Sequence, residues 1–198
     1  MTDTPDDLQS EYLNPFTEAQ WLFVSYLPFR IGLWLSEYEA GGGDRAENAE
    51  MRALSDIIIK AQEKYSNRPF LGALTHELEQ LVYGQEQKEL NLDKVLNDCK
   101  RALTTLKKQL PAEDVNCYKL LCIDVAEAVA KAAGDREFGA HNLHGGAKKG
   151  WFGAYPVIAS LTRLGHGPKV SSAEKEAINL LIDALGANEM VNKWGILE

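Results

Sequence analysis

Residues 21–35 read WLFVSYLPFRIGLWL, the most apolar stretch in this chain of 198 residues. A helix that spans a membrane needs about 20 consecutive apolar residues. This stretch is shorter, contains Pro28 and Arg30, and is followed by the charged sequence SEYEAGGGD. We therefore expect a buried core helix. Pro28 should kink or split it, because proline removes a backbone hydrogen bond and clashes with the preceding turn.

Apolar residues recur at three- and four-residue intervals along most of the remaining chain, a pattern typical of amphipathic helices. The sequences at 17–20 and 171–174 have the residue types of a capping box, which satisfies the first backbone N–H groups of a helix. No alternating pattern typical of β-strands is found. We therefore predict an all-α bundle of about six to eight helices. The expected helices lie near residues 17–40, 46–64, 67–84, 92–110, 111–134 and 171–186.

The composition is that of an ordinary globular protein, with 45% hydrophobic and 25% charged residues. We expect a flexible acidic arm at 1–16 and a single helical domain at 17–198. The net charge of −8 disfavours nucleic acid and anionic membranes as partners, and favours cations or a basic protein. The start of the chain is acidic and polar, unlike a signal peptide, which predicts a cytoplasmic location.

The cysteines, Cys99, Cys117 and Cys122, form no CxxC motif and cannot all pair with one another. This favours a reducing compartment. All three fall on apolar helix faces, so we expect core residues rather than nucleophiles. His76 lies off the apolar stripe of its helix, and we expect it to be solvated or to cap a helix.

The two halves of the chain contain similar helical hairpins, at about 20–65 and about 115–187. In each hairpin an apolar helix is followed by Gly-Asp, and a second helix opens near a glutamate, Glu50 or Glu174. Aligning these glutamates pairs Leu54 with Ile178, Ile57 with Leu181 and Ile58 with Ile182. The pattern predicts a bundle of two pseudo-repeats. The alternative is that any two amphipathic hairpins look alike.

An apolar helix, a short acidic linker and a second helix that opens with glutamate, present twice, resemble the tellurite-resistance protein TerB and related domains of DjlA-type co-chaperones. The linkers here read Gly-Asp-Arg, where that family usually has Asp-Gly, and a glycine-rich insertion at 134–168 expands the second linker. The resemblance implies a helical domain that binds metal through acidic positions, in a bacterial stress or tellurite-response system.

The candidate metal ligands are the carboxylates of the two linkers. Hard cations need clustered oxygen ligands, and two facing linkers would supply them. The alternative for Glu50 and Glu174 is that each stabilises a helix N-terminus. His141 and His144 are weaker candidates, since imidazole binds zinc but glycine-rich loops often hold surface histidines. The expected cofactor is a divalent cation (Ca, Mg, Mn or Zn), and the expected ligands are Asp44, Glu47, Glu50, Asp135 and Glu174.

Three functions are compatible with these features. The first is a non-enzymatic TerB-like domain that binds divalent cations or a protein partner. The second is an acidic inhibitor of the immunity or antitoxin type, which would cover a basic partner. The third is a metal-dependent hydrolase that uses the carboxylates together with His141 and His144. The glycine-rich stretch 144–153 lacks the residue order of a nucleotide-binding loop, and either binds a partner or packs onto the bundle.

Overall fold

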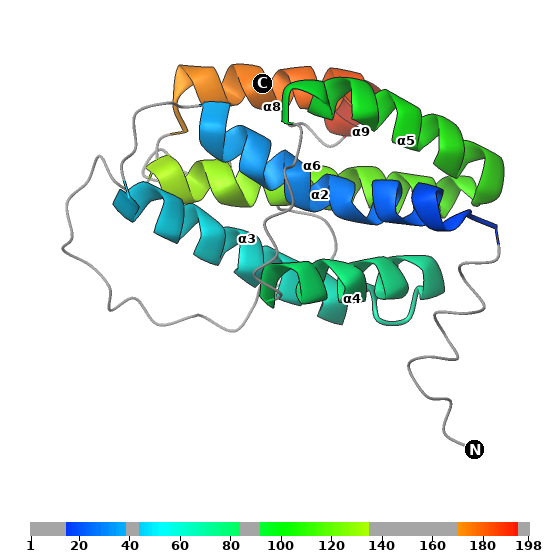
Figure 1. Cartoon of the computed structure of the whole chain (residues 1–198). Helices are drawn as coiled ribbons and strands as arrows, with labels where there is room; N and C mark the ends of the chain where they lie inside the picture. The colour runs from blue at the N-terminus through cyan, green and yellow to red at the C-terminus, as the bar shows by residue number, and fades with distance from the viewer. Residues whose placement is uncertain (1–14, 39–43, 84–91, 135–169, 194–198) are drawn as a thin grey trace.

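The computed structural model describes residues 15–38, 44–83, 92–134 and 170–193 (Figure 1). Within these ranges the chain forms helices and no strand, which confirms the all-α prediction. The elements are α2 (Glu18–Tyr38), α3 (Asp44–Tyr65), α4 (Pro69–Tyr83), the 3-10 helix η1 (Leu92–Lys94), α5 (Val95–Gln109), α6 (Ala112–Gly134), α8 (Ser172–Ala184) and α9 (Asn188–Lys193).

Helix α6 is the centre of the bundle and contacts α2, α3, α4, α5 and α8 (Figure 1). The fully buried Tyr118 of α6 donates a hydrogen bond of 2.9 Å to the backbone oxygen of Val24 in α2. Further along both helices, a Cβ atom placed on Gly32 would lie 3.3 Å from Val125 and 2.8 Å from Leu54 of α3. The absence of a side chain at Gly32 therefore lets three helices meet. The order of these contacts makes α2 and α6 parallel.

Helix α2 contains the apolar stretch 21–35, and it is a core helix as predicted. Val24, Leu27 and Ile31 are fully buried. The helix continues through Pro28, so the chain does not split there. Packing of the buried Pro28 and its neighbours offsets the lost backbone hydrogen bond. Among the described residues, no helix is long and apolar enough to cross a membrane.

The helix ends follow the signals in the sequence. The Thr17 hydroxyl accepts from the backbone N–H of Gln20 at 3.2 Å, and the Gln20 side chain accepts from the N–H of Thr17 at 2.9 Å. Gly186 has φ of 53° just after α8, a conformation that glycine adopts without strain. Phe16, at the end of the expected arm, is buried against Trp21 and Phe70. Helix α9 was not predicted.

Candidate functional site

Four helix ends meet at one end of the bundle, which we call the linker end. It comprises the C-terminal ends of α2 and α6 and the N-terminal ends of α3 and α8 (Figure 1). Ser36, near the end of α2, hydrogen-bonds Glu50, in the second turn of α3. Lys119 donates to the backbone oxygen of Gly186 at 2.9 Å, which holds the far end of α8 near the start of α6. Both acidic linkers therefore connect helices at the same end.

Glu50 is a buried member of the expected metal site, with 6% of its surface exposed. Its carboxylate accepts a hydrogen bond from the Ser36 hydroxyl. A carboxylate removed from water needs such donors, because its desolvation is costly. The contact also joins the last turn of α2 to α3 across the first linker.

Glu174, the expected ligand from the second hairpin, is 2% exposed and closes a capping box. Its carboxylate accepts from the backbone N–H of Ser171 at 2.7 Å, and its own N–H donates to the Ser171 hydroxyl at 3.1 Å. This confirms the helix-cap interpretation of Glu174. The same contacts fix the carboxylate at the N-terminus of α8, at the linker end.

Sequence reasoning missed a third buried glutamate, Glu127 in α6, which is 2% exposed. Its ion pair with Lys131 spans 3.3 Å. Burial raises the pKa of Glu127 to about 7, although Lys131 acts in the opposite direction. The sequence feature that could have indicated its burial is its position one helical turn after Asp124 within an apolar helix. That pattern alone does not tell a buried charge from an exposed one.

Asp124, on the same side of α6, is buried and pairs with Lys64 of α3 at 3.3 Å. Burial raises its pKa, and the charge of Lys64 opposes the shift. Helix α6 therefore carries two buried carboxylates one turn apart, each facing one lysine. The partner of Asp124 is half exposed, so water screens that attraction.

Several expected ligands lie outside the described residues. Asp44 begins α3, but its side chain and that of Glu47 are outside the description, as are Asp135, His141 and His144 entirely. Among the side chains that are described, no group of three His, Cys, Asp or Glu could hold a metal ion. A complete cation site at the linker end would therefore require at least one ligand whose side chain lies outside the described residues.

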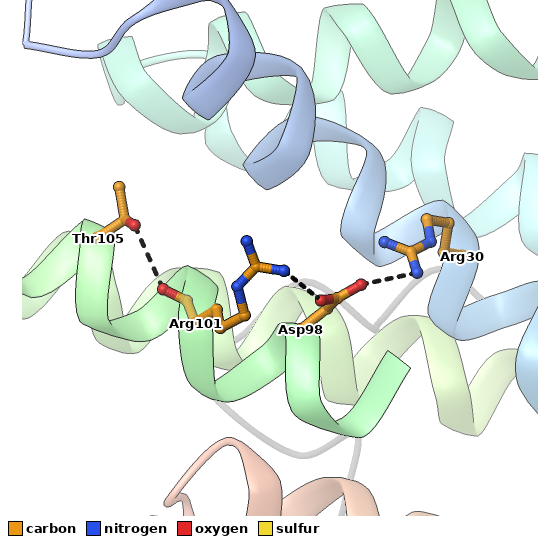
Figure 2. A network of polar contacts seen from close by, with 4 residues as sticks. All are labelled: Arg30, Asp98, Arg101 and Thr105. Atoms are coloured by element: carbon orange, nitrogen blue, oxygen red, sulfur yellow. Dashed lines mark hydrogen bonds and ion pairs between the residues drawn. The ribbon is translucent and has the colours of Figure 1, made fainter. Parts of the chain in front are cut away.

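A separate polar network joins α2 to α5 within the bundle (Figure 2). The buried Asp98 accepts from Arg30 at 2.9 Å and from Arg101 at 3.1 Å. Arg101 also lies over the ring of Phe23, 4.9 Å from its centroid. Two guanidinium groups share one carboxylate, so the charge of Asp98 is compensated within the protein and the network holds the two helices together.

The predictions for residues away from the linkers are confirmed. Cys99, Cys117 and Cys122 are buried, and burial raises the pKa of each thiol, which disfavours the reactive thiolate. His76 is partly exposed, with Nδ1 3.8 Å from Glu79. No family model, curated protein or solved structure matches this chain.

Proposed function

We propose that this chain is a non-enzymatic, TerB-like binding domain that takes up a divalent cation (Ca, Mg, Mn or Zn) at the linker end. The observation that carries the proposal is the burial of three glutamates on three different helices: Glu50 in the second turn of α3, Glu174 in the first turn of α8, and Glu127 two turns before the C-terminal end of α6. The resemblance to TerB suggests a role in a bacterial stress or tellurite response.

The physical argument is the cost of buried negative charge. A carboxylate taken out of water without a counter-charge raises its pKa or recruits a cation. Glu127 has the raised pKa expected of a carboxylate whose charge is incompletely compensated. The Ser36 hydroxyl and the Ser171 backbone N–H donate to Glu50 and Glu174, and in this proposal both carboxylates also bind the cation.

The linkers would supply the remaining ligands in this proposal. Asp44 and Glu47 belong to the N-terminal end of α3, and Asp135 follows the last residue of α6 in the sequence. Calcium takes six to eight oxygen ligands and magnesium six, so carboxylates from both hairpins would be required. This explains why the described side chains alone do not form a site.

The test is thermal unfolding of chelator-treated protein with each of the four cations. A ligand at about 100 times its Kd stabilises a fold by about 2.7 kcal/mol, and a protein of this size gains about 2–4 °C per kcal/mol. We therefore expect a rise in Tm of about 5–10 °C with at least one cation. Asp44→Asn combined with Glu50→Gln should abolish the rise, and Asp56→Asn combined with Glu63→Gln, on the exposed face of α3, should preserve it.

A rise that survives Asp44→Asn/Glu50→Gln would place the cation elsewhere and refute the proposed site. The absence of any rise would refute cation binding. In that case Glu50 and Glu174 would serve only as structural contacts.

A second candidate is a protein partner that covers the linker end, as an immunity-type inhibitor would cover a basic protein. The observation in its favour is exposed apolar surface, because Tyr38 and Met51 are each more than a third exposed. The ring of Tyr38 packs against that of Trp34, with 5.4 Å between the ring centroids. Tyr38→Ser with Met51→Ser should then release a co-purifying basic protein. Retention of that protein by the double variant would exclude this surface.

A further inference from the structure

The outward face of α5 is basic in an otherwise acidic chain. Residues 92–109 contain five basic and two acidic residues, a net charge of +3. Since the whole chain carries −8, the remainder carries −11. The five basic side chains are all exposed: Lys94, Lys100, Arg101, Lys107 and Lys108.

These side chains are arranged in two rows along the helix. Residues seven apart lie nearly above one another, about 10.5 Å apart along the axis. One row is therefore Lys94, Arg101 and Lys108, and the other is Lys100 and Lys107. The exposed, uncharged Asn97 and Thr104 lie between the rows. The first row is about 21 Å long and the second about 10.5 Å, so a neutral track of about 10.5 Å has positive charge on both sides.

Contacts between the described residues do not account for this charge. Asp98, the acidic residue within α5, is buried and engaged by Arg30 and Arg101. In the described part of the chain, the four lysines have no carboxylate within ion-pair distance, and the nearby Asp93 is exposed. Burial lowers the pKa of Lys119, and the charge of Lys107 lowers it further. A further basic group therefore lies near the C-terminal end of α5.

Helix stability accounts for part of the pattern only. Lys107 and Lys108 lie in the last turn, where positive charge is favourable. Lys94 is the N-cap residue, makes no capping hydrogen bond, and places positive charge at the positive end of the helix dipole. The stability of α5 therefore does not explain the lysine at this position.

We propose that the outer face of α5 binds an acidic segment of a protein partner. An extended segment of about six or seven residues covers the longer row, about 21 Å, and, along about half of its length, also lies within a Debye length, about 8 Å, of the shorter row. A nucleic-acid duplex or a membrane is wider. It would also meet the exposed acidic residues Glu176 and Asp183 of the neighbouring helix α8 (Figure 1).

The experiment measures binding of fluorescein-labelled decaglutamate by fluorescence anisotropy, at about 20 mM and about 150 mM salt. Lys100→Glu with Lys107→Glu should weaken binding at least about tenfold, or about 1.4 kcal/mol. The matched control, Arg52→Glu with Lys60→Glu, makes the same change in net charge on exposed positions of α3 and should change the affinity less than about twofold. If the first variant fails to fold, Lys100→Gln with Lys107→Gln replaces it, with a loss of about threefold expected.

Four results would overturn the proposal. The first is no binding of decaglutamate to the unaltered protein at low salt, and the second is an equal loss of affinity in the α5 variant and the α3 control. The third is α5-dependent binding of a ten-nucleotide thymidine strand or of phosphatidylserine vesicles that is tighter than binding of decaglutamate. The fourth is binding of decaglutamate only after removal of residues 1–14. The last would make the acidic N-terminal residues of this chain the occupant. None of them bears on cation binding at the linker end.

Discussion

Glu127→Gln should stabilise the protein by an amount that grows with pH. The glutamate is 2% exposed, and burial raises its pKa from 4.5 to about 7. Each unit of pKa difference between the folded and unfolded states corresponds to about 1.36 kcal/mol. The difference here amounts to about 3 kcal/mol as an upper limit, with the opposing effect of Lys131 already included.

The sign follows from which state binds the proton more tightly. Below about pH 4.5 Glu127 is protonated in both states and its ionisation costs nothing. Between about pH 4.5 and 7 the unfolded chain loses its proton first, so the folded state loses stability as the pH rises. Above about pH 7 both states are ionised, and the cost of burying the charge is complete. Glutamine keeps the shape of the side chain and never ionises.

Urea denaturation followed by tryptophan fluorescence, in the presence of chelator and at intervals from about pH 4.5 to 8.5, measures the effect. The free energy of unfolding of Glu127→Gln relative to the unaltered protein should rise by about 2–3 kcal/mol across this range. Glu176→Gln, at an exposed position of α8, is the matched control for loss of a carboxylate. A difference that is independent of pH, or equal to that of the control, would refute the reasoning.

Three further substitutions test the packing and the caps by urea denaturation at pH 7. Asp98→Ala should lower the free energy of unfolding by about 3–5 kcal/mol, because it removes the carboxylate that the buried Arg30 faces. A loss below about 1 kcal/mol would contradict this role of the network. In Gly32→Ala, the 2.8 Å approach of the new Cβ atom to Leu54 should cost about 1–3 kcal/mol, and the higher helix propensity of alanine should offset roughly 1 kcal/mol of that cost. A stabilised variant would show that Leu54 relaxes freely. Ser171→Ala should cost about 1 kcal/mol by removing the cap of α8, whereas Ser172→Ala should not, and equal effects would exclude the capping role.

Features that depend on neighbouring residues were predictable from the sequence, and those that depend on tertiary packing were not. The capping boxes at Thr17 and Ser171 involve contacts only three residues apart, and both are present. Pro28 does not split α2, because packing against helices far away in the chain stabilises the helix on both sides of it, and local propensity does not include that packing. Glu127 was missed for the same reason: its burial is decided by helices that pack around α6.

The two buried carboxylates Asp98 and Glu127 differ in how they are neutralised, and this difference separates structure from candidate function. Asp98 faces two guanidinium groups, so its charge is compensated and its removal should only weaken the fold. In the described part of the chain, Glu127 pairs with Lys131 alone, and its pKa is raised. A fold under selection for stability alone would replace such a group by an apolar one. Together with the burial of Glu50 and Glu174, the incomplete compensation of the Glu127 charge supports the proposal of a positively charged ligand at the linker end.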